Sequence, residues 1–444
     1  MKIALSIAGS DSGAGAGIQA DLKTFSALGV YGCTAITAIT AQNTKKVADI
    51  FAIPSSLVEQ QIKSVITDLP PDAIKIGMVY NREIINSVYR SLRKHETPIV
   101  LDPILAAGTG AKLLRDDSLD SLVSKLMPMC MLITPNRLEA EKIAGIKIRT
   151  VSDGIEAAKK IRQLGAKNVI IKGGHFESSS VTDLLLDNKG RLTKISSLRV
   201  KISESHGSGC NFSSAVTAYL AKGAVLEDAC RMANEYVHIA IKNAIKAGRG
   251  LPVTNPLSSI YIDANRYRVI EELQAAVQEV ISLDGFYKLI PETQTNFVYA
   301  LPESIGISEV AGVRGRIIRV GRTAMPASHI EFGASKHMAS AIIGYRRINP
   351  SFRSGINIRF SKELVKTCKR LFSISKYDRG IEPKGIKKKE GSSMSWGTMQ
   401  ALSKNSRADV IYHEGDVGKE PMITIFGRNP HEVADKIKAI LQTY

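Results

Sequence analysis

The sequence lacks several features that would place it in a special structural class. Its 444 residues include one tryptophan, and its five cysteines are widely spaced with no C-x-x-C pair. This spacing argues against a disulfide framework and a zinc ribbon, so we expect reduced thiols. No apolar run approaches the roughly 20 residues that a membrane-spanning helix needs, and glycines follow the first residues before a signal-peptide core could form. The sequence therefore predicts a cytoplasmic protein.

What is present is an ordinary globular composition with an excess of positive charge. Hydrophobic residues make up 44% and charged residues 23%, which excludes disordered and collagenous chains. The net charge of +18 suits anionic partners, but it is dispersed apart from the cluster at 387–389, and no helix-turn-helix or zinc-finger pattern accompanies it. We therefore expect small phosphorylated molecules as partners, and neither nucleic acid nor a membrane. The alternative is that most of this charge is a generally basic surface.

The first half of the chain alternates short apolar runs with amphipathic helical patterns. This alternation predicts a doubly wound α/β fold, in which helices cover a parallel sheet. The expected strands are 2–9, 34–40, 72–78, 98–103, 131–136 and 168–174.

Near residue 250 the pattern changes. The segment 248–256 (GRGLPVTNP) holds two glycines and two prolines, and a long helical pattern follows from about Asp263 to Ser282. We therefore expect a first domain at 1–256, a linker at 257–264 and a second domain at 265–444. The second domain is again predicted to be α/β, with a polar loop from Arg379 to Ser395. Its expected strands are 315–321, 355–360 and 421–427, and its expected helices lie near 333–345, 361–373 and 430–442.

Three motifs follow predicted strands, where a parallel sheet places its ligands. The turn GSDSGAGAG (9–17) lets a backbone approach a ligand closely, although it is neither a Walker A loop nor a G-x-G-x-x-G motif and could equally be a structural turn. In TPNRLE (134–139), Asn136 and Glu139 could approach a hydrated Mg²⁺, or they could simply cap a helix. In IKGGH (171–175), Lys172 could meet a phosphate.

The fourth motif, SHGSGCNFSSA (205–215), is the most specific. Its Gly-Ser-Gly turn runs into an apolar helix, so the backbone N–H groups of Gly207, Ser208 and Gly209 predict an anion hole for a transferring phosphoryl group. Cys210 follows in the first helical turn. The helix dipole would favour its thiolate, which makes Cys210 a candidate catalytic base, while the alternative is an inert packed thiol.

These motifs come in an order that is familiar. From Ile3 to about Pro256, IAGSDSGAGAGIQADLKTFSALGVYG, TAITAQNT, KIGM, LDP, ITPN, IKGGH and HGSGC resemble the hydroxymethylpyrimidine/phosphomethylpyrimidine kinases of thiamine biosynthesis, members of the ribokinase-like superfamily. Sugar kinases of that superfamily carry Asp where this clade, and this sequence at Cys210, carries Cys. GAGAG replaces the more usual GGAG, and Ser208 and Asn211 stand where threonines are common.

The resemblance implies ATP as co-substrate, Mg²⁺ as cofactor, and phosphorylation first of the hydroxymethylpyrimidine and then of its monophosphate. It implies that Gln42 recognises the aminopyrimidine, for which a side-chain amide can supply both a donor and an acceptor. It also suggests a homodimer or larger assembly. The remaining implied positions are Gly9, Asp21 and Met78 in the substrate pocket, Lys172 at the ATP phosphates, and Asp102, Asn136 and Glu139 on the magnesium side.

The second domain offers glycine-rich basic loops that suit phosphate or pyrophosphate, and its histidines lack the spacing of a zinc site. It resembles the archaeal-type thiamine-phosphate synthase domain over nearly all of 265–444, which implies a three-layer α/β fold like that of class II aldolases. The motifs that carry the likeness are GRI (315–317), FGASxH (332–337), NIR (357–359) and GDxGKEP (415–421).

The implied reaction displaces pyrophosphate from the pyrimidine diphosphate by the nitrogen of a thiazole phosphate, giving thiamine phosphate. Arg316 and His337 match positions tied to catalysis, the first as a guanidinium on the leaving pyrophosphate and the second as a further donor or proton source. Two alternatives stay open: the second domain could bind thiamine phosphates only as a sensor, or the kinase could act on pyridoxal or a sugar.

Overall fold

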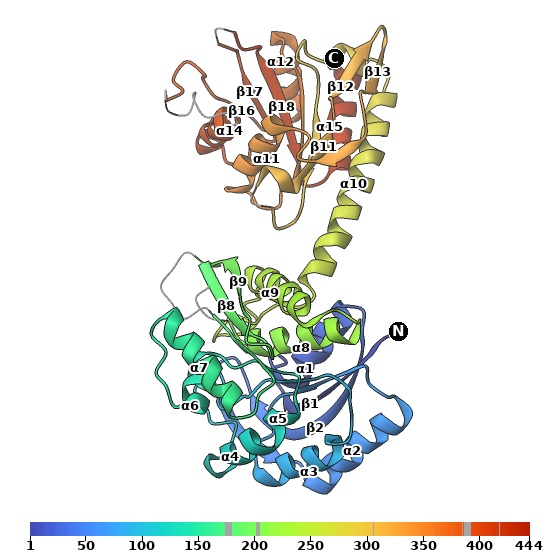
Figure 1. Cartoon of the computed structure of the whole chain (residues 1–444). Coiled ribbons are helices and arrows are strands. Elements are labelled where there is room, and N and C mark those ends of the chain that lie inside the picture. The colour runs from blue at the N-terminus through green and yellow to red at the C-terminus, as the bar shows by residue number, and fades with distance from the viewer. Residues whose placement is uncertain (174–179, 201–204, 305, 384, 386–391, 417) are drawn as a thin grey trace. The chain divides into compact units, whose positions relative to one another are not determined.

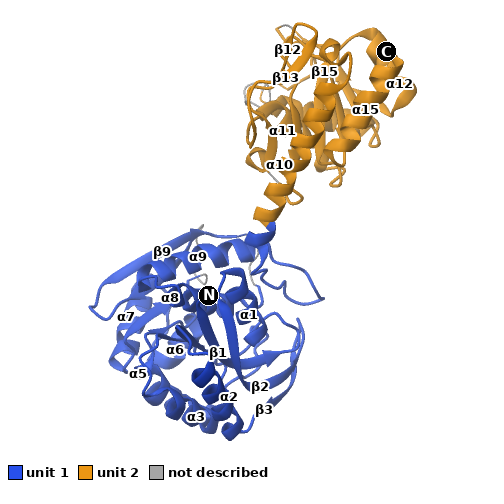
Figure 2. Ribbon diagram, turned by 90° about the vertical axis from the view of Figure 1, so that its right-hand side faces the viewer, with its two compact units in different colours: residues 1–261 blue, residues 262–444 orange. Residues whose placement is uncertain are grey.

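The computed structural model describes the chain except for residues 174–179, 201–204, 305, 384, 386–391 and 417 (Figure 1). The chain divides into two compact units, residues 1–261 and residues 262–444 (Figure 2). Each unit has its own sheet and its own hydrophobic cores. Within the described residues, no helix is both long and apolar enough to cross a membrane.

The first unit is built on a nine-stranded sheet in the order β3-β2-β1-β4-β5-β6-β7-β8-β9. Its centre, from β2 to β7, is parallel, and β3, β8 and β9 add antiparallel edges. This confirms the predicted mostly parallel, ribokinase-like α/β sheet. The strands are β1 (Ile3–Asp11), β2 (Tyr31–Gln42), β3 (Val47–Ala52), β4 (Ala73–Ile76), β5 (Ile99–Leu101), β6 (Leu132–Ile133), β7 (Asn168–Ile171), β8 (Ser180–Leu186) and β9 (Leu192–Leu198).

Helices cover both faces of this sheet because successive strand residues point to opposite sides. In β1, Leu5 and Ile7 join the core under α2, α3, α6 and α7, whereas Ala4 joins the core under α1, α8 and α9. The last residue of the strand expected over 168–174 lies outside the described residues. The helices are α1 (Gly17–Ala27), α2 (Ser55–Asp68), α3 (Arg82–Leu92), α4 (Leu119–Ser121), α5 (Met127–Met129), α6 (Arg137–Ala144), α7 (Val151–Gln163), α8 (Ser208–Ala221) and α9 (Leu226–Lys242).

The second unit has a seven-stranded sheet in the order β14-β11-β10-β15-β18-β17-β16, and a separate β12-β13 hairpin. Unlike the first sheet it is antiparallel throughout except between β16 and β17. The strands are β10 (Phe297–Ala300), β11 (Val310–Val313), β12 (Ile317–Val320), β13 (Thr323–Pro326), β14 (Ile330–Phe332), β15 (Ser354–Arg359), β16 (Ile374–Lys376), β17 (Val410–His413) and β18 (Met422–Gly427).

Helices again cover both faces, which gives three layers. One face packs against α10 (Ser258–Ser282), α12 (Lys362–Leu371) and α15 (Pro430–Thr443), and the other against α11 (Lys336–Arg346) and α14 (Ser392–Lys404). Two expectations need correction. Most of the linker expected at 257–264 is the start of α10, and the last four residues of the loop expected up to Ser395 belong to α14, which begins at Ser392. Residues 384 and 386–391 of that loop lie outside the described residues.

A buried ion pair joins the elements beneath the strand ends of the first unit. Lys75 of β4 and Asp21 of α1 are 2.8 Å apart, and neither side chain is exposed. Ser6 of β1 and Ser214 of α8 donate hydrogen bonds of 2.6 and 2.7 Å to the same carboxylate. Such hydrogen bonds are what make the burial of two charges tolerable.

Lys75→Met is therefore expected to destabilise the first unit by about 3–5 kcal/mol, because it leaves the Asp21 carboxylate buried without its counter-charge. Native-state hydrogen exchange of the β4 amides measures this loss within the intact chain. Lys2→Met is the matched control, since its pair with Asp72 is half-exposed, and it should change stability by about 1 kcal/mol or less. Equal effects of the two substitutions would contradict this account.

Candidate active site

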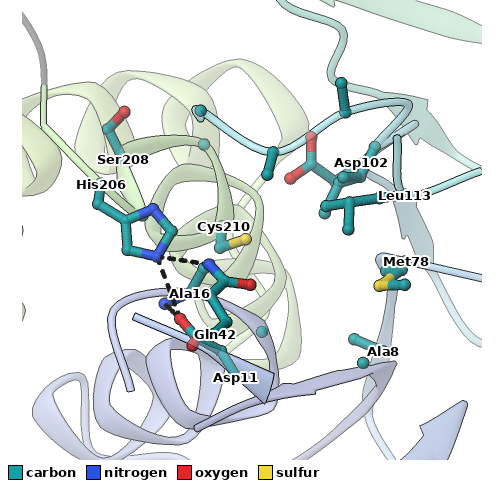
Figure 3. A pocket seen from close by; sticks show the side chains of 18 of the residues that line it. Ala8, Asp11, Ala16, Gln42, Met78, Asp102, Leu113, His206, Ser208 and Cys210 are labelled. Carbon is teal, nitrogen blue, oxygen red and sulfur yellow. Dashed lines mark hydrogen bonds and ion pairs between the residues drawn. The ribbon is translucent and has the colours of Figure 1, made fainter. Parts of the chain in front are cut away.

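A cavity that opens to solvent lies at the carboxyl ends of the parallel strands of the first unit (Figure 3). This is where parallel α/β sheets bind ligands. The structure brings nearly all the site residues predicted for this domain to its walls. They are Gly9, Gln42, Met78, Asp102, Asn136, Glu139, Lys172, Gly207, Ser208, Gly209 and Cys210.

Asp21 is the exception. The resemblance placed it in the substrate pocket, but its side chain is fully buried and is not among the residues that line the cavity. Its carboxylate binds Lys75 and two serine hydroxyls instead. Asp21 therefore lies outside the cavity, and its carboxylate holds together the elements that form the cavity wall.

The glycine-rich turn is organised by Asp11, a residue that the sequence analysis did not single out. One oxygen of its carboxylate accepts a 2.8 Å hydrogen bond from the Gly13 N–H, and the other accepts from the N–H groups of Gly15 and Ala16. That second oxygen also lies 3.1 Å from Nε2 of His206. Burial alone would raise the pKa of Asp11, but these hydrogen bonds hold it below its usual value, so the carboxylate is ionised. The sequence signal that could have revealed this role is the aspartate within the glycine-rich motif GSDSG.

The two glycine turns pack directly against each other. Gly207, the residue before α8, has a positive φ of 89°, and a Cβ there would lie 1.8 Å from the carbonyl oxygen of Gly15. Only glycine fits both the conformation and the space. The first residues of α8 line the cavity, which is the position that the predicted anion hole requires.

Cys210 lies in the first turn of α8 and lines the cavity, as expected, but its predicted acidity is wrong. Burial raises the pKa of its thiol to about 11, although the nearby Lys75 ammonium opposes this shift. The cost of burying a thiolate therefore exceeds the benefit of the helix dipole. The Cys210 thiol is therefore neutral near pH 7, and its role as a catalytic base stays a prediction.

Lys172 comes after β7 and reaches the carboxylate of Asp102 at 3.0 Å. Burial alone would lower the pKa of Lys172, but the Asp102 and Glu139 carboxylates more than offset it, so the pKa is raised and the ammonium stays charged. Burial raises the pKa of Glu139 to about 7, with Lys172 opposing and Asp102 adding to the shift. The cavity thus holds one fixed cation between two carboxyl groups.

Asn136 and Glu139 form a capping box at the start of α6, which was the alternative to a magnesium role. The Asn136 side chain accepts from the Glu139 N–H at 2.9 Å, and Glu139 accepts from the Asn136 N–H at 2.8 Å. The predicted cap is therefore formed, and because an amide oxygen has a second lone pair, a role for Asn136 beside Mg²⁺ stays a prediction. Asp102 and Glu139 still fit Mg²⁺, which takes one or two carboxylates together with substrate phosphates. Within the described residues, no cluster of three or more metal-ligating side chains exists.

In the second unit, three of the predicted motifs meet at one end of the sheet, where several strands begin or end. We call this end the motif edge of the second unit. Arg316 donates to the carbonyl of Thr293, and Asn357 accepts a 2.7 Å hydrogen bond from the Asn296 N–H. Glu420 accepts from the N–H groups of Glu292 and Thr293, each at 2.9 Å. Three motifs that are distant in sequence therefore converge on residues 292–296.

His337 lies exposed in the first turn of α11, which begins beside the motif edge. Ser335 caps that helix, and a Cβ on Gly312 would lie 3.5 Å from the Ser335 side chain and 3.1 Å from that of Asn296. Arg316 adopts a positive φ of 71°, a conformation that costs a residue other than glycine on the order of 1–3 kcal/mol. Such a cost is typical of functional positions.

His413, at the end of β17, is buried close to the motif edge. Burial lowers the pKa of its imidazole to about 4, and the Arg379 guanidinium adds to the effect. Nδ1 of the ring accepts from the Gly415 N–H at 3.2 Å, and the ring packs against Tyr377, which in turn meets the single tryptophan, Trp396, edge-on. His413 therefore supports the loop that carries GDxGKEP as a neutral side chain.

A mostly parallel sheet with a helix N-terminus, a lysine and glycine turns around one cleft defines a ribokinase-like kinase of small molecules. The chain belongs to the phosphomethylpyrimidine kinase family, whose model matches residues 11–255. The model described as "Thiamine-phosphate synthase ThiN" matches residues 272–439. Both resemblances found in the sequence are confirmed.

One relative matches the whole chain, and others match little more than half of it. The chain is 33% identical over 446 residues to the bifunctional thiamine biosynthesis protein ThiDN of Methanocaldococcus jannaschii, covering 100% of this chain and 99% of the relative. It is 43% identical over 254 residues to the hydroxymethylpyrimidine/phosphomethylpyrimidine kinase of Bacillus subtilis, which covers 57% of this chain and 93% of that one. A solved Bacillus subtilis pyridoxal kinase in complex with ADP has a TM-score of 0.55 and 36% identity, over 59% of this chain and 99% of that one.

The high pKa of Cys210 predicts slow alkylation. With a pKa of about 11, about one thiol in 3,000 is ionised at pH 7.5, so iodoacetamide should modify Cys210 at least 100-fold more slowly than free cysteine. The rate, followed by peptide mass spectrometry, should rise with pH up to about 11. Rapid modification at pH 7 that a bound pyrimidine prevents would show a thiolate and support the base assignment.

The low pKa of His413 predicts acid lability of the second unit. Between pH 6.5 and 4 the unfolded chain binds a proton that the folded chain excludes, so stability falls as the pH falls. From pH 7.5 to 5 this group alone should cost about 2 kcal/mol. Urea unfolding followed by Trp396 fluorescence reports on this unit, and His413→Gln should remove that part of the pH dependence. His431→Gln, at a half-exposed histidine, should leave it unchanged.

Proposed function

We propose that the first unit transfers phosphate from ATP to 4-amino-5-hydroxymethyl-2-methylpyrimidine and then to the resulting monophosphate. The second unit then couples the diphosphate with thiazole phosphate, giving thiamine phosphate and pyrophosphate. The observation that carries the proposal is the convergence of the α8 N-terminus, Lys172 and Gln42 on one cleft in a chain of this family. The two reactions also connect, because the product of the first is the substrate of the second.

In the kinase step the protein mainly positions reactants and neutralises charge. The backbone N–H groups of Gly207, Ser208 and Gly209 would bind the transferring oxygens, and the Lys172 ammonium the ATP phosphates. Bound Mg²⁺ would neutralise phosphate charge, and Asp102 and Glu139 are the residues that would hold it. The Cys210 thiol would contact the hydroxymethyl group as a neutral side chain. The hydroxyl proton of that group would then pass to an oxygen of the transferred phosphoryl group.

In the synthase step negative charge builds up on the departing pyrophosphate. The Arg316 guanidinium would meet this charge, and His337 would act as a second donor or proton source. The positive φ of Arg316 and the convergence of three motifs on residues 292–296 support this placement. A sensor that only binds thiamine phosphates would use the motif edge for binding without turnover.

Incubation of the purified chain with the hydroxymethylpyrimidine, ATP, Mg²⁺ and thiazole phosphate should give thiamine phosphate, detected by chromatography. Arg316→Ala and His337→Ala should each lower its formation by about 100-fold or more and leave formation of the pyrimidine diphosphate unchanged. Arg428→Ala and His431→Ala, at exposed positions of the same unit, serve as matched controls. A wild-type reaction that stops at the diphosphate would favour the sensor. A protein that phosphorylates pyridoxal but not the pyrimidine, when each is offered in a separate incubation, would refute the kinase substrate.

A further inference from the structure

The amide of Gln42 does not stand alone on the cavity wall. Its nitrogen lies 3.0 Å from Nε2 of His206, and the same Nε2 lies 3.1 Å from the carboxylate of Asp11 (Figure 3). His206 is nine-tenths buried and, like Gln42, lines the cavity. One ring nitrogen thus serves two partners at once.

The two contacts restrict where hydrogens can be. Asp11 is ionised and can only accept, so Nε2 of His206 must carry a hydrogen. A protonated Nε2 cannot also accept from the amide nitrogen of Gln42. The two contacts are compatible when the amide makes a half-turn, because its oxygen then faces His206 and accepts from the same N–H.

That half-turn also satisfies the other side of the amide. Thr40 Oγ1 lies 3.4 Å from the position that the amide nitrogen then occupies, and its hydroxyl already donates to the Ser10 carbonyl at 3.0 Å. The Thr40 oxygen is thus free to accept from the amide. Gln42 would present to the cavity one N–H and the remaining lone pair of its oxygen. This pattern complements a ring nitrogen beside an exocyclic amine.

The imidazole is held tightly enough to impose this orientation. A Cβ on Gly15 would lie 2.3 Å from Cδ2 of the ring, so the ring fills the space that this glycine leaves. The backbone of His206 is fixed as well, since its N–H donates to the Pro252 carbonyl at 2.8 Å and its carbonyl accepts from the Thr254 N–H. The ring is therefore restrained on the side of Gly15, and its backbone is restrained by two hydrogen bonds.

We propose that His206, oriented by Asp11, is a positioning residue that fixes the amide of Gln42 and thereby makes the kinase select a 4-aminopyrimidine over the corresponding 4-oxo compound. The 4-oxo compound presents a ring N–H beside a carbonyl, which is the reverse pattern. A freely turning amide would accept either compound. This inference rests on the proposed function, in which Gln42 meets the pyrimidine.

The test uses two substitutions that differ by one methylene. His206→Gln can still donate to both Asp11 and Gln42, whereas His206→Asn is too short to reach Gln42. The measured quantity is the ratio of kcat/KM for the hydroxymethylpyrimidine to that for its 4-oxo analogue. The fraction of active enzyme cancels in this ratio, so partial misfolding does not obscure it.

We expect His206→Asn to lower the ratio at least tenfold and to raise the KM for the pyrimidine, with the KM for ATP unchanged within twofold. His206→Gln should restore most of the preference, and His95→Asn, at an exposed histidine of the same unit, should match the wild type. An unchanged ratio in His206→Asn would overturn the inference, as would parallel rises in both KM values with no rescue by glutamine. Failure of the wild type to phosphorylate the pyrimidine would instead refute the proposed function.

Discussion

The first unit depends on a charge that is neutralised entirely inside the protein. Asp21 and Lys75 have no access to solvent, so their ion pair and the two serine hydroxyls must offset the full cost of removing the charges from water. The four side chains come from α1, β4, β1 and α8, so their contacts hold these four elements together. That arrangement fixes where β1 ends and where α8 begins, which are the two places that carry the glycine turns.

Under the proposed function both units bind anions, but their sheets differ. In the first, parallel strands all end at one edge, and helix N-termini follow them there. In the second, antiparallel strands bring alternate starts and ends to one edge, so side chains such as Asn296 and Asn357 tie the edge together. Under the proposed function, the first unit would present mostly backbone N–H groups to its ligands, whereas the second would present the side chains of Arg316 and His337.

Much of this could be predicted from the sequence, and the failures have physical causes. Apolar alternation predicted the parallel strands of the first sheet but missed the antiparallel strands β3, β8 and β9, and the order of the motifs identified both domains. The place of Asp21 and the acidity of the Cys210 thiol were misjudged because a motif shows which residues gather near a site and not which of them are buried. Asp11 and His206 were missed because their partnership joins residues 195 apart in the chain. The start of α10 was placed too late because the glycine- and proline-rich segment before it predicts a linker, whereas the helix begins just after that segment.

Helix α10 gives the order of synthesis a structural meaning. Its residues Leu273 and Val277 share one hydrophobic cluster with Ile437 and Ile440 of α15, which is the last helix of the second unit in the sequence. During translation the first unit emerges complete before any of the second sheet exists, and domains fold as units in that order. The core of the second unit can close only when α15 has been made. A chain that stops short of α15 would therefore carry a folded kinase attached to an unfinished partner domain.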